Sequence, residues 1–104
     1  MELTANQLTQ YAKKHLENQG FRLNRVNNVP WGRRKGTIEK GWADLQGYSK
    51  NGKYVAVEVK KIGDKLSKYQ IDRLQDVTNC GGIVYICTEK NRMPTLVPWE
   101  EMKY

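Results

Sequence analysis

The chain has 104 residues, of which 38% are hydrophobic and 28% charged, and this length suits a single domain, residues 1–104, with a modest core. Its 18 Lys and Arg against 11 Asp and Glu give a net charge of +7, which favours a polyanionic partner. The sequence shows neither a secretory leader nor a long apolar run. It therefore predicts a cytoplasmic protein with no membrane association.

The first expected element is a helix that begins after Thr4. Thr4 and Gln7 have the spacing of a capping box, in which each side chain accepts a hydrogen bond from the main chain of the other residue. Apolar residues recur at helical spacing from Leu8 to Leu16, and Gly20 follows as a helix stop.

Residues 21–29 are expected to form the first strand, because apolar and polar side chains alternate from Phe21 to Asn24. Arg25 then falls on the apolar side of this alternation. Two interpretations stay open for it: the strand has already left the core, or Arg25 contacts phosphate or supports the structure.

The segment 30–36 is an expected loop with three consecutive cations next to Trp31, and Lys40 follows shortly after it. Cations neutralise phosphates and an exposed aromatic ring can stack on a base, so this segment is a candidate nucleic-acid contact. A basic loop that is merely solvated is the alternative.

The run 53–61 alternates with period two, which is typical of a strand with one buried face. Its valines would occupy the core face, with Glu58 and Lys60 on the other. The preceding run 41–49 is a second strand. Between the two runs, Asn51-Gly52 favours a tight hairpin turn in which both residues have positive φ.

This hairpin would bring Asp44 opposite Glu58. Two carboxylates offer oxygen ligands to a hard cation, and Lys60 would lie on the same face as Glu58, roughly 6.5–7 Å along the strand. The alternative is that Glu58 and Lys60 are simply solvated on an outer face.

A second helix is expected after Ser67, which forms another capping box with Gln70. This box is a sufficient structural reason for Gln70, although a role at the site is also open. Residues 83–87 form an apolar run suited to a strand covered on both faces, and residues 98–102 suggest a short terminal helix.

Cys80 ends the second helix and Cys87 lies in the last expected strand. Both thiols are expected to be reduced and to pack as small buried hydrophobic groups. A zinc site is not expected, because the sequence has one histidine, His15, and lacks a Cys-x-x-Cys pair.

Asp44 followed by Glu58-Val59-Lys60 resembles the motif of the PD-(D/E)XK nucleases. The wider frame resembles the stand-alone VRR-NUC domain of phages and bacteria over about residues 2 to 88. That frame consists of Gly41-x-x-Asp44-Leu45-x-Gly47, Glu58-x-Lys60, Leu66-Ser67-x-x-Gln70 and Gly81-Gly82. Ala43 stands where the family often has proline, a departure that concerns the local turn and not the chemistry.

The resemblance implies a restriction-endonuclease-like α/β fold, with an α-β-β-β-α-β core and a mixed central sheet flanked by helices. It also implies that Asp44, Glu58 and the main-chain carbonyl of Val59 hold Mg²⁺, for which Mn²⁺ would substitute, and that Lys60 and Gln70 complete the catalytic set. An acidic residue near the first helix often joins this site in the family. Here Glu2 fits that place, although it precedes the helix cap.

The function that we favour from the sequence is a metal-dependent endonuclease that hydrolyses DNA phosphodiester bonds. It would resemble a phage-type Holliday-junction resolvase and act as a homodimer on branched DNA. The expected DNA-contacting residues are Arg25, Arg33, Arg34, Lys35, Lys40, Lys61 and Lys68.

Large apolar residues without a clear core position are candidates for the dimer interface, namely Trp31, Trp99 and Met102, and packing within their own subunit is the alternative. Two rival functions also stay open. One is a non-catalytic nucleic-acid-binding module on the same fold, and the other is a basic structural protein. Neither a binding module nor a structural protein would gain from two carboxylates that face a phosphate backbone.

Overall fold

The computed structural model describes residues 2–26 and 43–102. In these two ranges it contains two α-helices, five strands and one 3-10 helix. In chain order they are α1 (Ala5–Asn18), β1 (Arg22–Arg25), β2 (Leu45–Tyr48), β3 (Tyr54–Lys60), α2 (Lys68–Asn79), β4 (Ile83–Lys90), β5 (Met93–Pro98) and η1 (Trp99–Glu101).

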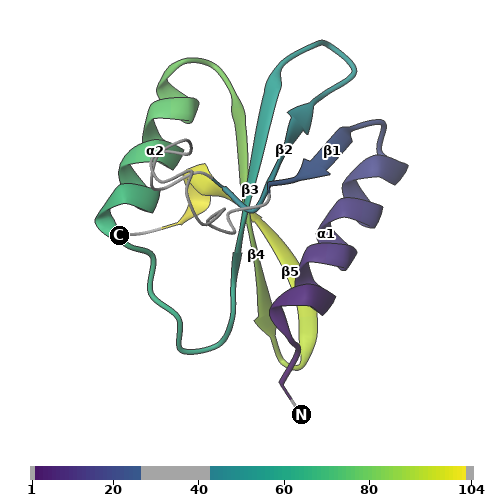
Figure 1. Ribbon diagram of the computed structural model, residues 1–104, viewed down its shortest axis with the longest axis vertical. Helices are drawn as coiled ribbons and strands as arrows, with labels where there is room; N and C mark the ends of the chain where they lie inside the picture. Colours follow the sequence, from purple (N-terminus) through teal and green to yellow (C-terminus); the bar gives the residue numbers. More distant parts are fainter. Residues whose placement is uncertain (1, 27–42, 103–104) are drawn as a thin grey trace, which may run out of the picture.

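The strands form one mixed sheet in the order β1-β2-β3-β4-β5. Its neighbouring strands are antiparallel except for β3 and β4, which are parallel and joined through α2. Figure 1 shows α1 and α2 on opposite sides of the sheet, so that the sheet is the middle layer of three. The predicted α-β-β-β-α-β core is confirmed.

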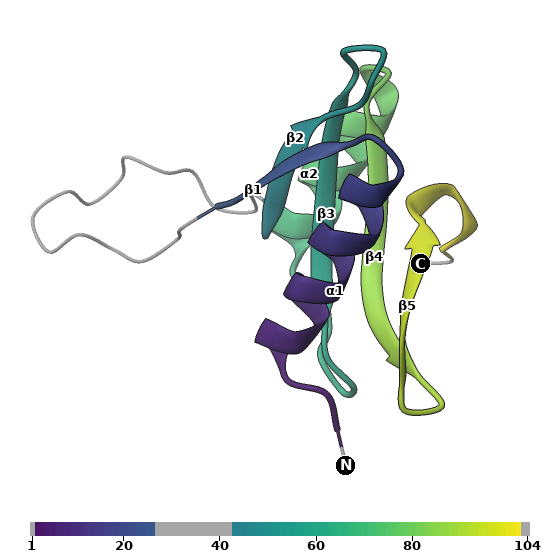
Figure 2. The ribbon, with the colours of Figure 1, turned by 90° about the vertical axis from the view of Figure 1, so that its right-hand side faces the viewer.

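Helix α1 covers one face of the sheet, which is the face toward the viewer in Figure 2. The predicted capping box is present: the Thr4 hydroxyl accepts from the Gln7 N–H at 3.1 Å, and the Gln7 side chain accepts from the Thr4 N–H at 2.8 Å. The apolar stripe of the helix, which includes Leu8 and Leu16, is almost fully buried. Burial of this stripe holds the helix in place on the sheet.

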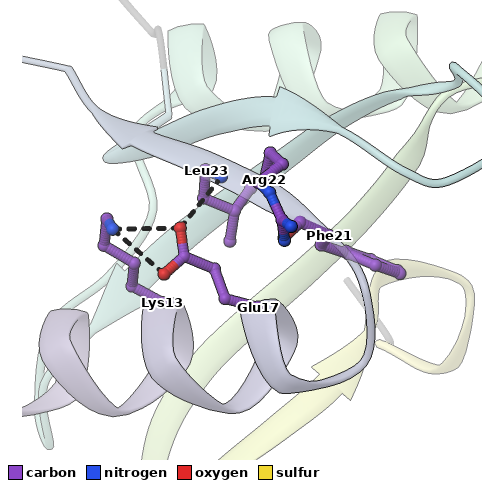
Figure 3. A network of polar contacts seen from close by, with 5 residues as sticks. All are labelled: Lys13, Glu17, Phe21, Arg22 and Leu23. Atoms are coloured by element: carbon purple, nitrogen blue, oxygen red, sulfur yellow. Dashed lines mark hydrogen bonds and ion pairs between the residues drawn. The ribbon is translucent and has the colours of Figure 1, made fainter.

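Glu17 ties the end of α1 to β1, as Figure 3 shows. Its carboxylate pairs with the Lys13 ammonium at 3.0 Å and accepts from the Leu23 N–H at 3.5 Å. The hydrogen bond from Lys13 is the main reason why the pKa of Glu17 lies below its ordinary value. Strand β1 begins at Arg22, and the expected end of the strand, residues 27–29, lies outside the described residues.

Strand β3 is buried on both of its faces. Val55 and Val57 are buried in the cluster beneath α1, whereas Ala56 belongs to a second cluster with Leu74 of α2. Glu58, on the same face as Ala56, is 3% exposed. The expectation of one buried face is therefore wrong, because the helix that connects the parallel strands β3 and β4 lies over the second face.

The β2–β3 hairpin forms where the sequence predicted it, but with a different turn. Ser49 and Lys53 close the loop through a hydrogen bond from the Ser49 N–H to the Lys53 carbonyl. Gly52 has a φ of 78°, while Asn51 is not among the described non-glycine residues with positive φ. The loop has three residues rather than two, which calls for one left-handed residue instead of two.

Gly47 permits the close approach of β1 to β2. A Cβ atom at this position would collide with the main chain of Arg22, which lies on the neighbouring strand. Main-chain atoms cannot move aside as a flexible side chain can, so only glycine fits here without shifting the strand.

Helix α2 starts at the second predicted capping box. The Ser67 hydroxyl accepts from the Gln70 N–H at 3.1 Å, and the Gln70 side chain accepts from the Ser67 N–H at 2.7 Å. Leu74 is buried at the centre of the cluster that this helix shares with the sheet. The described helices include none that is long and apolar enough to cross a membrane.

Strand β5 was not predicted from the sequence. It is reached through a tight turn in which Asn91 and Arg92 both have positive φ, at 53° and 64°. The expected terminal helix is present as the short η1. Its Trp99 is buried and donates a hydrogen bond to Gln75 at 3.2 Å, and Met102 packs against the same cluster. Both residues therefore pack within their own subunit, which was the alternative to a dimer interface.

The two cysteines differ in environment. Both are free thiols, as expected, and Cys87 is buried. Cys80 is exposed, so the expectation that it is buried is wrong. It occupies the C-cap of α2, where the chain turns away from the core.

Candidate active site

Asp44 stands at the start of β2, opposite Glu58 of β3. Leu45 pairs with Val57 in this antiparallel ladder. Asp44, one residue before Leu45, therefore lies opposite Glu58, one residue after Val57. The Asp44 Oδ2 atom accepts a hydrogen bond from the Val59 N–H at 2.8 Å, and the Asp44 carbonyl accepts one from the Val26 N–H at 2.9 Å. These contacts hold the Asp44 carboxylate against β3.

Glu58 is a buried carboxylate with one of its two oxygen atoms engaged in a hydrogen bond. Its Oε2 atom accepts a hydrogen bond from the Gln70 Nε2 atom at 2.8 Å. Its Oε1 atom is buried and has no hydrogen-bond partner within residues 2–26 and 43–102. An unpartnered buried carboxylate oxygen is costly, so this atom is suited to accept a ligand.

The environment of Glu58 disfavours its charged form. Burial, and next to it the neighbouring Asp44 carboxylate, raise the pKa of Glu58 to about 9. Two close carboxylates repel each other, and removal from water strengthens that repulsion. In the absence of a cation, Glu58 is expected to carry a proton at neutral pH.

Gln70 has both of the roles that the sequence left open. Its Oε1 atom closes the capping box with the Ser67 N–H, while its Nε2 atom donates to Glu58. Because the two ends of one amide group are engaged at once, the start of α2 and the Glu58 carboxylate are fixed relative to each other.

Lys60 lies two residues beyond Glu58, near the end of β3 and on the same face of the sheet. It is half-buried, and its partner across the parallel ladder is Thr88 of β4. The predicted grouping of Asp44, Glu58 and Lys60 at one end of the sheet is therefore present in the fold.

The donor set at this end of the sheet fits a hard divalent cation. Asp44 and Glu58 contribute carboxylate oxygens, and the unpartnered Glu58 Oε1 atom is free to accept a ligand. A cation would also offset the repulsion that raises the Glu58 pKa. In residues 2–26 and 43–102 no group of three or more His, Cys, Asp or Glu side chains is arranged for a metal.

Arg25 is next to Asp44 in the order of the sheet, but its side chain lies on the face that α1 covers, opposite to Glu58. It pairs with Leu45 across the β1–β2 ladder, one residue away from Asp44, and its Nη1 atom donates to the Asn6 Oδ1 atom at 3.0 Å. Its side chain is exposed, so the strand has left the core at this residue. Asn6 was not predictable as its partner, because no local sequence pattern connects positions 19 residues apart.

The other expected DNA-contacting residues divide into two groups. Lys61 is half-buried and follows β3, and Lys68 is exposed at the first position of α2, so both lie near Lys60 in the chain. The remaining four lie outside the described residues, namely Arg33, Arg34, Lys35 and Lys40. Glu2, the acidic candidate near the first helix, is exposed.

Glu89 is a second buried carboxylate that the sequence analysis did not single out. It lies in β4 and accepts a hydrogen bond from the Leu3 N–H at 2.6 Å. The contact joins residues 86 positions apart, so it secures the N-terminal segment before α1 to the sheet.

The fold resembles that of a known nuclease structure. The chain is similar to Hjc, a Holliday junction resolvase from the archaeal hyperthermophile Archaeoglobus fulgidus, with a TM-score of 0.59 and 19% sequence identity. The alignment covers 91% of this chain and 79% of Hjc. At this identity the similarity establishes a shared fold and nothing more.

The family follows from the sequence match. The VRR-NUC domain matches residues 4–91, which is most of the chain. This protein therefore belongs to the VRR-NUC family of nuclease domains. No curated protein sequence matches it at a significant level.

Proposed function

We propose that this chain is a metal-dependent endonuclease that hydrolyses DNA phosphodiester bonds as a single domain. The observation that carries the proposal is the buried Glu58 carboxylate, which faces Asp44 and keeps an unpartnered oxygen. A binding module would gain nothing from such a pair, because two carboxylates repel phosphate and their burial lowers stability.

Asp44, Glu58 and the main-chain carbonyl of Val59 would hold the cation. Mg²⁺ suits oxygen ligands and keeps several waters, and Mn²⁺ would substitute for it. When bound, the ion supplies a Lewis acid that polarises a phosphoryl oxygen and lowers the pKa of a coordinated water. The hydrogen bonds from Val59 and Gln70 leave the two carboxylates little freedom to rotate, so the site is preorganised.

Lys60 is the proposed cationic catalytic residue. Its ammonium group is carried on the same face as Glu58, where it would orient the attacking water or offset the charge that develops on the phosphate. Gln70 is a positioning residue, because its contact is with the Glu58 carboxylate. Arg25, Lys61 and Lys68 would contact the phosphates on either side.

The proposed substrate is branched DNA, cut by a homodimer. Support comes from the similarity in fold to Hjc, a Holliday junction resolvase. One chain has one proposed site, and cutting two strands at related positions requires two sites related by a two-fold axis, the commonest symmetry of soluble oligomers.

The test is cleavage of supercoiled plasmid, linear duplex and a four-way junction with Mg²⁺, with Mn²⁺ and with EDTA. Cleavage should require the metal, disappear in Asp44→Asn, and favour the junction. Equal cutting of duplex and junction by a monomer would remove the resolvase part and leave a general nuclease. DNA binding without cleavage under any metal would leave a non-catalytic binding module.

A further inference from the structure

A cavity opens on the face of the sheet that carries α2, which is also the face of Glu58. Its volume is about 430 Å³, and it lies between the β2–β3 hairpin and the last turns of the helix. The residues that matter for its chemistry are Gln46, Lys53, Tyr54, Arg73 and Asp76. None of them belongs to the proposed catalytic set.

The cavity is connected to the catalytic end by the strands themselves. Tyr54 and Glu58 lie on the same face of β3, four residues apart, which corresponds to roughly 13 Å. Gln46 likewise follows Asp44 on the same face of the hairpin, because it pairs with Ala56. A stacked DNA strand rises about 3.4 Å per nucleotide, so this separation spans roughly four nucleotides.

The chemistry of the cavity is not that of a bare phosphate site. Lys53 and Arg73 are cations, but Asp76 shares the lining and the C-terminal end of α2 adds partial negative charge. A nucleobase suits this mixture better, since its edge presents both hydrogen-bond donors and acceptors. Gln46 and Asp76 provide side chains that can meet such an edge.

Tyr54 provides an aromatic surface at the same place. Its side chain is 36% exposed, so part of the ring is accessible from the cavity. Partial burial raises the pKa of Tyr54, and the nearby Arg73 guanidinium opposes this shift. An accessible ring beside cations is the arrangement on which single-stranded nucleic acids stack their bases.

We propose that this cavity binds one unpaired base of the DNA strand, about four nucleotides from the scissile phosphate. The base would stack on Tyr54 and hydrogen-bond with Gln46 and Asp76, while Lys53 and Arg73 contact the adjoining phosphates. The inference deepens the proposed nuclease function by adding a site for DNA that is single-stranded next to the cut, as at a branch point.

The experiment measures binding of a fluorescent single-stranded oligonucleotide in EDTA, in an Asp44→Asn background that cannot cleave it. Tyr54→Leu should weaken binding about 5-fold to 100-fold, the range expected when one stacked base is lost. Tyr54→Phe keeps the ring and should bind within about twofold of the parent. Equal affinities for the Leu and Phe variants would overturn the stacking.

A second pair of variants tests the cavity while leaving the Tyr54 side chain in place. Lys53 is exposed in the hairpin, and Lys14 is exposed on α1, which covers the opposite face of the sheet. Lys53→Ala and Lys14→Ala change the net charge equally, so a larger loss of affinity and of salt dependence is expected for Lys53→Ala. Equal losses would show a general charge effect and overturn the cavity as the binding site.

The outcome is separable from that of the nuclease proposal. Because binding is measured without metal, a protein that binds through Tyr54 and Lys53 but never cleaves DNA would keep the cavity and reject the nuclease. If instead the wild type cleaves DNA with metal while the variants within each pair bind DNA equally, the nuclease proposal stands and the cavity is rejected as the binding site.

Discussion

The buried carboxylate pair predicts an unusual pH dependence of stability for the metal-free protein. The perturbation is Glu58→Gln, which removes the titratable carboxyl group but keeps the shape and the capacity to accept the Gln70 hydrogen bond. In the wild type the pKa of Glu58 is raised from 4.5 to about 9, first by burial and then by Asp44. The variant has no such group.

The direction in which the free energy of unfolding changes with pH follows from the number of protons that the folded and unfolded states bind. Between pH 4.5 and about 9 the unfolded chain has lost the Glu58 proton while the folded protein keeps it. Folding then requires proton uptake, so the free energy of unfolding of the wild type falls as the pH rises through this window. Because one pKa unit corresponds to about 1.4 kcal/mol, the loss amounts to several kcal/mol by the upper end of this window.

The assay is urea unfolding in EDTA at several pH values from 5 to 9, for the wild type, Glu58→Gln and Glu100→Gln. Glu100 is exposed on η1, so its variant makes the same chemical substitution at a carboxyl group that is not buried. Glu58→Gln should gain stability over the wild type by about 1.4 kcal/mol per pH unit, and Glu100→Gln should show a difference that is nearly constant.

Metal provides the second half of this test. Mg²⁺ at about 100 times its dissociation constant should stabilise the wild type by about 2.7 kcal/mol and leave Glu58→Gln almost unchanged. If the free energies of unfolding of the wild type and Glu58→Gln change equally across the pH range and with Mg²⁺, burial does not perturb Glu58 and the inference of a cation at Asp44 and Glu58 is refuted.

Three further predictions concern activity and binding. Asp44→Asn should abolish cleavage while its affinity for DNA stays equal or rises, because a charge that repels phosphate is lost; cleavage that survives would remove Asp44 from the metal site. Lys60→Ala should lower the cleavage rate by roughly 100-fold or more with an unchanged circular dichroism spectrum, and an unfolded variant would instead assign Lys60 to the core. Arg25→Ala should weaken DNA binding and reduce the salt slope by roughly one, whereas Asn6→Ala should weaken binding less; an unchanged slope for Arg25→Ala would mean that Arg25 does not contact phosphate.

Several features of this protein are set by local sequence and were predictable from it. Both capping boxes, at Thr4 and Ser67, connect residues three positions apart, so their residue types alone define the helix starts. The alternation from Tyr54 to Lys60 predicted β3 with its bounds correct to one residue, because side chains in a strand alternate between faces whatever the fold. The hairpin register then made Asp44 the partner of Glu58.

Other features depend on contacts between distant residues. The turn at Asn91 and Arg92 lacks the glycine that usually marks a tight hairpin, so β5 gave no local signal. The burial of Glu58 follows from the placement of α2 over β3, which alternation along one strand cannot reveal. The role of Asn6 beside Arg25 is likewise visible only in three dimensions.

The sequence by itself determined which carboxylates and which lysine share one end of the sheet, because strand periodicity and hairpin pairing are local rules. Only the tertiary structure decided the electrostatic state of those groups. Desolvation depends on everything that packs around a side chain. The helix that buries Glu58 also donates one hydrogen bond, from Gln70 to the Oε2 atom, and leaves the Oε1 atom without one. The raised pKa and the unpartnered oxygen at the candidate metal site are therefore properties of the packed molecule.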